Sequence, residues 1–290
     1  MFLLILVSSL VIGSVYGLIA LGYSLIYRSS GLMSFIQGDL LTLGAFLGYT
    51  LYGPLQIPFA ISLAIVSVFM FFFGMLIERG VIRRLQNKNV LAIYTVLATI
   101  AISYIIQNGA MFTWGTSMKA FPPVFETREI QLFGRGLQSE AVFCVVVGLV
   151  TMAVLHVFMN LTSLGTSMRA AAMDPVAARA CGIDVSWTIG LSWGIAAGIA
   201  ALGGMLIGPI YGVYTTFGAA IGRKGFSSAV IGGYGNMIGA ILGGLLLGIV
   251  ETFTAAYISS AYKELVAYTL LIIFLFVKPT GLLNERAIAE

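Results

Sequence analysis

Two carboxylates stand out in this sequence because each borders a long stretch without charge. Asp39 comes directly before the uncharged run 40–77, and Glu251 comes directly after the run 225–250. An ionisable group in apolar surroundings is costly, and it is commonly retained for function. Both carboxylates are therefore candidates for a polar pathway through the molecule. The neighbouring candidates are Ser34, Gln37, Gly38, Gly233 and Asn236.

The chemistry open to these residues is the binding of a zwitterion. Gln37 and Asn236 lie in two glycine-rich stretches that could break helices, SFIQGD and GGYGN. Exposed N–H and C=O groups at broken helix ends can meet a carboxylate and an ammonium group. Alternatively, Asp39 only caps the helix that follows it, and Glu251 lies at the membrane surface. No hydrolytic triad, metal cluster or cofactor fingerprint is recognisable, so we predict no catalytic residue, metal or cofactor, and no enzyme.

The elements that must position these residues are long apolar helices. A bilayer-spanning helix needs about 20 mostly apolar residues, and only helices and closed barrels satisfy every backbone group in lipid. The runs in this chain are too long for barrel strands, so we predict an all-α, multi-pass membrane protein with about eight spans. The uncharged runs are 1–27, 40–77, 89–118, 141–168, 185–222 and 225–250.

Charge asymmetry predicts the topology. The stretch ERGVIRRLQNK, residues 78–88, is strongly basic and therefore cytoplasmic, whereas residues 119–140 balance their charges and are external. The chain then returns, which puts residues 161–185 in the cytoplasm. A cytoplasmic C-terminus further requires that residues 225–236 dip into the membrane and come back, with a helix from about 237 to 253 completing the return.

An internal repeat accompanies this pattern. GLIALGYSLI from Gly17 recurs as GIAALGGMLI from Gly198, and GDLLTLGAFLG from Gly38 recurs as GYGNMIGAILG from Gly233. We expect a single domain, 1–290, with approximate repeat halves 1–88 and 187–290. A parallel repeat would make the N-terminus cytoplasmic and RSSGLMSFIQGD a second dip. Alternatively, spans rich in Gly, Ala and Leu look alike by chance.

The segment 161–185 is too long for a simple connection between two spans. Asp174 followed by Pro175 is a helix start, and Gly182 is a helix stop. The segment therefore predicts two short helices with an elbow at Asp174, forming a docking element for another protein. Its candidate contact residues are Arg169, Ala172, Asp174, Pro175, Ala177, Ala178, Arg179 and Gly182.

Several stretches resemble the permeases of branched-chain amino-acid ABC transporters, of the LivH kind. RAAAMDPVAARACGI is similar to the cytoplasmic coupling loop of that family. SFIQGDLLTLGAF, IERGVIRRL, GFSSAVIGGYGNMIGAILGGLLLGIVE and KELVAYTLLIIFLFVKPTGLL also match it, in order and over nearly the whole chain. Ser34 departs from the family pattern, where asparagine is usual.

The resemblance implies one membrane subunit of an importer in the bacterial inner membrane. Its implied partners are a homologous second permease, two cytoplasmic ATPases, a periplasmic substrate-binding protein and membrane lipid. The sequence has no P-loop, G-x-x-x-x-G-K-[ST], so energy would come from a partner acting on the coupling loop. The net charge of +4 suggests no nucleic acid. The alternatives are a urea or short-amide permease, or a stand-alone secondary transporter or channel.

Overall fold

A computed structural model describes residues 2–88, 91–125, 129–132 and 135–283. Within these residues, seven helices are long and apolar enough to cross a membrane, so the prediction of a multi-pass helical membrane protein is confirmed. The strands within the described residues are β1 (Glu129–Leu132) and β2 (Arg135–Gln138), which form a short antiparallel hairpin. The spanning helices are α1 (Phe2–Ser30), α3 (Phe59–Ile77), α5 (Ala92–Trp114), α6 (Ser139–Leu161), α9 (Val185–Tyr211), α11 (Met237–Tyr257) and α12 (Lys263–Val277).

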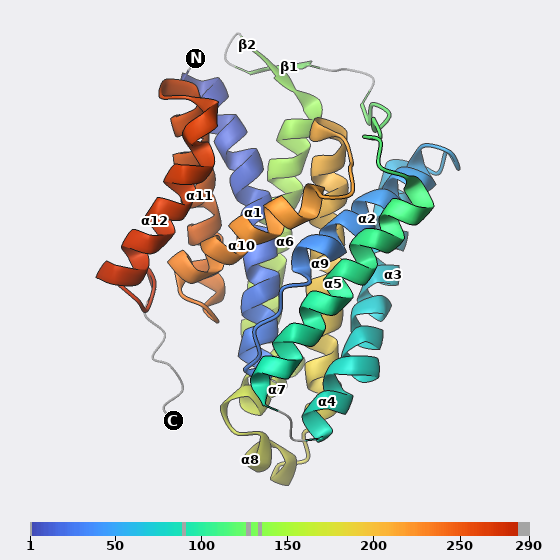
Figure 1. Cartoon of the computed structure of the whole chain (residues 1–290), viewed down its shortest axis with the longest axis vertical. Helices are drawn as coiled ribbons and strands as arrows, with labels where there is room; N and C mark the ends of the chain where they lie inside the picture. The colour runs from blue at the N-terminus through green and yellow to red at the C-terminus, as the bar shows by residue number, and fades with distance from the viewer. Residues whose placement is uncertain (1, 89–90, 126–128, 133–134, 284–290) are drawn as a thin grey trace.

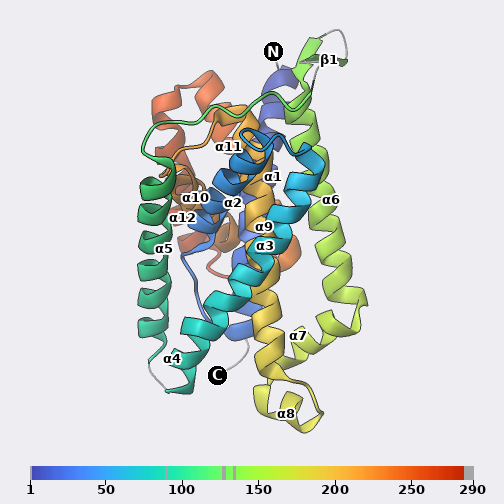
Figure 2. The same cartoon turned by 90° about the vertical axis from the view of Figure 1, so that its right-hand side faces the viewer.

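Shorter elements join or interrupt these spans. A π-helical turn, η1 (Glu78–Ile82), carries α3 into α4 (Arg83–Asn87), and the 3₁₀ turn η2 (Ser260–Tyr262) precedes α12. Two short helices, α7 (Ser163–Met173) and α8 (Pro175–Ala180), project from one end of the bundle, as Figures 1 and 2 show. We call this the α8 end, and the opposite end, with β1 and β2, the hairpin end.

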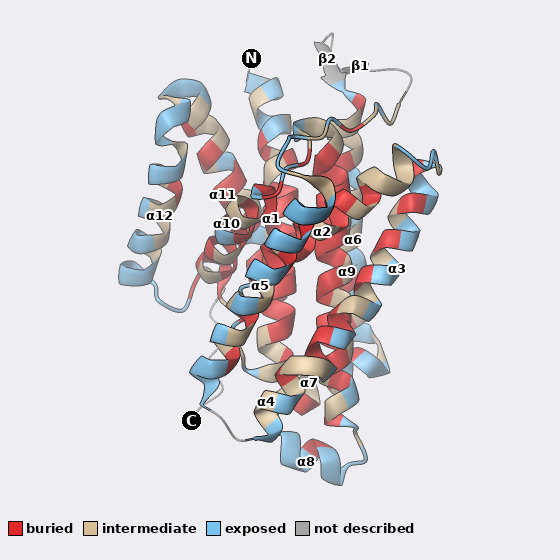
Figure 3. Ribbon diagram, turned by 45° about the vertical axis from the view of Figure 1, so that its right-hand side comes forward, coloured by how far each residue is buried: buried red, intermediate tan, exposed pale blue. Residues whose placement is uncertain are grey.

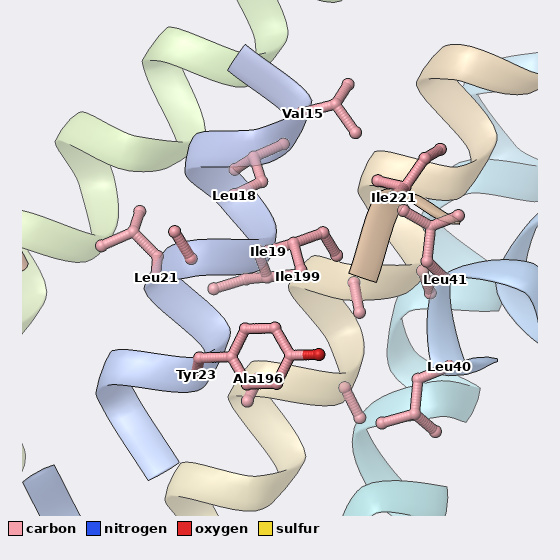
Figure 4. Packing of buried hydrophobic residues seen from close by; sticks show 14 of the residues in the cluster. Val15, Leu18, Ile19, Leu21, Tyr23, Leu40, Leu41, Ala196, Ile199 and Ile221 are labelled. Carbon is pink, nitrogen blue, oxygen red and sulfur yellow. The ribbon is translucent and has the colours of Figure 1, made fainter. Parts of the chain in front are cut away.

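Helices α1 and α9 form the buried centre of the bundle. Figure 3 shows both almost entirely buried along their middle turns, and Figure 4 shows side chains of α1, α2 and α9 packing together there. Small residues permit this close approach. A Cβ on Gly244 of α11 would lie 2.3 Å from the backbone nitrogen of Gly17, and one on Gly204 of α9 would lie 2.2 Å from the carbonyl oxygen of Leu41.

Two half-length helices, α2 (Gln37–Tyr52) and α10 (Phe217–Gly232), cross beside this centre. After α1 the chain returns through residues 31–36, and α2 then begins partway along the bundle (Figure 1). The backbones of the two helices touch where glycines face each other. A Cβ on Gly38 would lie 2.3 Å from the carbonyl oxygen of Gly218, and one on Gly222 would lie 2.8 Å from the Cα of Gly38. The crossing therefore requires residues without side chains.

Residues 225–236, predicted to dip into the membrane, form the end of α10 and a tight turn into α11. Gly233 and Gly235 both have positive φ, at 109° and 97°, which favours glycine. Beyond α12, the chain folds back onto this turn: the N–H groups of Leu282 and Leu283 donate to the carbonyl oxygens of Ile231 and Gly232, at 2.9 and 3.2 Å. These bonds satisfy the last carbonyls of α10.

A parallel repeat would place the N-terminus on the same face as residues 161–185, and the structure does not have this arrangement. Figures 1 and 2 place the N-terminus at the hairpin end. The chain passes along the bundle three times before η1, through α1, α2 and α3, so residues 2 and 78 lie at opposite ends. With a parallel repeat, the N-terminus and residues 161–185 would lie at the same end of the bundle.

The repeat also differs from a parallel one. Helices α1 and α9 run in opposite directions in Figure 1. The half-length helix α2 packs on α9 while α10 packs on α1, and likewise α3 packs on α9 while α11 packs on α1. This reciprocal pattern relates α1, α2 and α3 to α9, α10 and α11 in an inverted sense. Ten-residue similarities between Gly-rich helices carry no direction, so they do not decide between a parallel and an inverted arrangement.

Candidate functional site

A cavity of about 770 Å³ lies beside the crossing of α2 and α10, and α5 and α12 complete its walls. Its size is within the range of about 300–1,000 Å³ typical of small-molecule sites. The polar residues that line it are Tyr23, Asp39, Ser103, Tyr104, Gln107, Tyr214, Thr216, Arg223, Ser227 and Tyr268.

Asp39 is the carboxylate of this cavity. It lies in the first turn of α2, where the free N–H groups of a helix favour negative charge. Its side chain is 3% exposed, and its Oδ2 accepts a hydrogen bond from the Ser103 hydroxyl of α5. Its Oδ1 is buried and has no hydrogen-bond partner in the described structure. The carboxylate is therefore fixed by one oxygen and retains acceptor capacity at the other.

Arg223 is the cation of the same cavity. It lies midway along α10 and is exposed, in contrast to the buried Lys224 that follows it. Its guanidinium makes no hydrogen bond or ion pair within the described residues. An exposed arginine on a re-entrant helix needs water, lipid headgroups or protein around it, because hydrocarbon solvates it poorly.

Aromatic rings form an apolar wall of the cavity. The Phe226 ring of α10 lies edge-on to that of Tyr23, with centroids 5.7 Å apart, and 5.3 Å from that of Phe35. Ile100 and Leu271 add aliphatic surface from α5 and α12. The cavity therefore combines two opposite charges with an apolar wall.

Glu251 lies outside this cavity, in a closed buried network. Its Oε1 accepts from Lys224 Nζ at 2.5 Å, and its Oε2 accepts from the Tyr16 hydroxyl at 2.9 Å. The ammonium group also lies 5.8 Å from the centroid of the Tyr16 ring. Both oxygens are used, so Glu251 links α1, α10 and α11 and offers nothing to a solute.

The other predicted pathway residues divide between these locations. Gly38 lines the cavity at the helix crossing, whereas Gly233 and Asn236 lie at the turn between α10 and α11. The Asn236 side chain caps α11 by accepting from the N–H of Gly239 at 2.9 Å. Ser34 and Gln37 are fully enclosed, and their polar side-chain atoms have no partner in the described structure. Of the seven predicted residues, the cavity lining includes only Gly38 and Asp39.

The segment 161–185 folds as two helices with an elbow at Asp174, as predicted. The carboxylate of Asp174 accepts from the N–H groups of Val176 and Ala177, at 2.8 and 3.0 Å, and Pro175 begins α8. Gly182 follows α8 with φ of 84°. Local capping rules were sufficient here because they involve residues adjacent in sequence.

Only part of the predicted docking set is available on the surface. Asp174, Pro175, Ala177, Arg179 and Gly182 are exposed, but Arg169 and Ala172 are half-buried. Ala178 is 4% exposed and packs with Ala171 and Val185, so it lies inside the segment and cannot meet a partner. The exposed apolar surface of the elbow instead comes from Met173 and Val176, at 72% and 74%.

Sequence reasoning missed Arg223, together with Ser103 and the aromatic wall. The signal that could have found Arg223 is the isolated pair Arg223–Lys224, the only charges between residues 185 and 250. In the sequence alone, that pair marks only the boundary between the uncharged runs 185–222 and 225–250. Ser103 and Phe226 carry no such signal, because a serine and a phenylalanine in apolar helices are ordinary residues.

Known proteins resemble this chain along nearly its whole length. The family model for the branched-chain amino acid transport system / permease component matches residues 5–275. The high-affinity branched-chain amino acid transport system permease protein LivH of Escherichia coli strain K12 is 31% identical over 296 residues, covering 96% of this chain and 94% of that protein. BraD, the corresponding permease protein of Pseudomonas aeruginosa strain PAO1, is 33% identical over 302 residues, covering 98% and 96%.

Among solved structures, PsaBC from Streptococcus pneumoniae in complex with Fab aligns with a TM-score of 0.49 and 13% identity, covering 94% of this chain and 91% of that chain. A likeness this distant supports no conclusion about this chain. The family model and the full-length relatives do, and the family is a transporter component, not an enzyme family. This multi-pass membrane protein therefore belongs to the permease component family of branched-chain amino acid transport systems.

Proposed function

We propose that this chain is a membrane subunit of an ATP-binding-cassette importer that moves branched-chain amino acids into the cytoplasm across a bacterial inner membrane. The cavity beside the crossing of α2 and α10 carries this proposal, since it places charged and apolar groups together within a transport-component family. The permease relatives named above act on branched-chain amino acids, which favours this substrate over urea or short amides.

Energy comes from partner ATPases, because the sequence contains no P-loop. The elbow between α7 and α8 is their docking site. It projects from the α8 end in Figure 1, and it exposes Met173, Val176 and Ala177 on a pre-formed, capped helix start. Its underside is anchored to α9 through the packing of Ala178 against Val185. A push on the elbow therefore reaches α9, against which the half-length helix α2 packs.

A homologous second permease covers the cavity on the side where Arg223 is exposed. Lipid tails would solvate that guanidinium poorly, whereas a partner subunit can enclose it and complete a pathway between the two chains. Membrane lipid surrounds the remaining apolar surface. A periplasmic substrate-binding protein delivers the solute to the hairpin end, opposite the ATPases.

The test is uptake and ATP hydrolysis by the assembled transporter in proteoliposomes. We expect leucine uptake to need ATP and the loaded binding protein, with urea not taken up. Uptake of leucine without ATPases would favour a secondary transporter or channel, and uptake of urea in preference to leucine would favour an amide permease.

The docking role is tested by Ala177→Trp, which adds bulk to an exposed face of α8. We expect the ATPases to be lost from the purified complex, or their response to loaded binding protein to fall at least tenfold, because packed interfaces accommodate little added volume. The control is Ile258→Trp. Ile258 follows the last residue of α11 and is 70% exposed. A wild-type ATPase response in the Ala177→Trp complex would remove the elbow from the coupling role.

A further inference from the structure

The cavity holds a carboxylate and a guanidinium that do not pair with each other. Gly38 and Gly222 are in backbone contact at the helix crossing, and Asp39 and Arg223 are the next residue along each helix. Both side chains line the same cavity. The Oδ1 atom of Asp39 is without a partner in the described structure, and so is the guanidinium of Arg223.

Opposite charges left unpaired in a partly enclosed site are stabilised best by a ligand that carries both complementary charges. An ammonium group has three donors and no acceptor, which suits the free carboxylate oxygen, and a guanidinium accommodates a carboxylate through two parallel hydrogen bonds. We propose that Asp39 binds the α-ammonium group, and Arg223 the α-carboxylate, of the amino acid during its passage. This inference rests on the proposed function and adds that the permease itself recognises the zwitterion.

The apolar wall of the cavity receives the side chain of the substrate. The Phe226 ring lies edge-on to Tyr23 and tilted against Phe35, and Ile100 and Leu271 extend the apolar surface. At about 770 Å³, the cavity is roomier than one amino acid requires. The permease therefore selects for the two charges common to all α-amino acids and only loosely for the shape of the side chain.

Solute protection of a cysteine tests this site directly. Ala220→Cys places a thiol on the cavity lining, in a Cys181→Ser background that removes the exposed native thiol and leaves Cys144 buried. The complete transporter in proteoliposomes is labelled with a maleimide in the presence of leucine, leucinamide or isocaproate. Leucinamide lacks the carboxylate, and isocaproate lacks the ammonium group.

We expect leucine to slow labelling at least fivefold and each analogue to slow it less than twofold. Asp39→Asn and Arg223→Gln should each abolish protection by leucine. The matched controls Glu140→Gln and Lys263→Gln remove the same charges outside the cavity and should keep protection. Equal protection by leucine and isocaproate, or full protection in the Asp39→Asn variant, would overturn the inference.

The same vesicles separate this inference from the proposed function. ATP-dependent leucine uptake with no protection of the cysteine would leave the importer function standing and reject recognition by Asp39 and Arg223. Absence of leucine uptake by the unmodified transporter would instead reject the proposed function, and with it the basis for a zwitterion site.

Discussion

Asp39 and Glu251 are both buried carboxylates on helices that pack against α10. Glu251 bonds to Lys224, whereas Asp39 lines the same cavity as the preceding residue, Arg223. Glu251 meets Lys224 and Tyr16 and uses both of its oxygens. Asp39 uses one oxygen, and the neighbouring Arg223 pairs with nothing in the described structure. A buried charge in a membrane protein therefore signals a pathway only when its hydrogen-bonding capacity is left open. One helix, α10, presents a closed ion pair on one side and an open site on the other.

Breaking the Lys224–Glu251 ion pair by removing one partner is expected to give the largest effect on stability. Glu251→Gln leaves the buried Lys224 with only the exposed carboxylate of Glu264, 3.9 Å away, and removal of one partner of a buried pair costs roughly 3–5 kcal/mol. We expect a large fall in folded yield and in the temperature of unfolding in detergent, both measured on purified protein. A variant as stable as the wild type would mean that Glu264 or water compensates Lys224, and the contrast with Asp39 would disappear.

Replacing both members of the pair sharpens this result. Lys224→Met combined with Glu251→Leu removes both charges and leaves only the Tyr16 hydroxyl unsatisfied. The unfolding free energy should recover to within about 1–3 kcal/mol of the wild type, the cost of one unmade hydrogen bond. The same thermal unfolding assay measures it. A double variant less stable than Glu251→Gln would show that the ion pair stabilises the fold by more than the cost of burying its two charges.

Asp174 offers a third carboxylate, exposed and used as a helix cap. Asp174→Ala should cost about 1 kcal/mol of local order, because two N–H groups of α8 lose their acceptor. Hydrogen exchange of the backbone amides of residues 176–180 would measure this as faster exchange, and Asp174→Asn, which retains a capping oxygen, is the control. Unchanged exchange would mean that packing of Ala178 alone holds α8.

Asp39→Asn is expected to have the smallest effect on stability, even though its effect on solute protection is large. An asparagine oxygen can still accept the hydrogen bond from Ser103, and no cation is left uncompensated. The free energy of unfolding should stay within about 0.5 kcal/mol of the wild type. A loss comparable to that of Glu251→Gln would assign Asp39 a structural role and end the comparison.

Hydropathy and local capping were sufficient to predict the spans, the elbow at Asp174 and the dip before α11. These features depend on residues close in sequence. The geometry of the cavity was not predictable, because it depends on α2, α5, α10 and α12, which pack together only in the folded chain. Gly38 is in backbone contact with Gly218, a partner that the sequence does not identify.

The errors have the same origin. Ala178 and Ala177 are neighbours of one residue type, and only the packing of α8 on α9 buries the first and exposes the second. Glu251 looked like an isolated charge because its partner, Lys224, lies on a different helix. The direction of the repeat depends on how often the chain traverses the bundle, which similarity between short helices does not determine.

The hydrogen bonds from Leu282 and Leu283 to the end of α10 have a consequence for biosynthesis. The ribosome makes residues 231 and 232 well before residues 282 and 283, and α11 and α12 must be inserted in between. Until the later residues arrive, the last carbonyls of α10 lack their native donors inside the bundle. The turn between α10 and α11 is therefore completed late, and a chain released before Leu282 would present an α10 end with unsatisfied carbonyls to the membrane quality-control machinery.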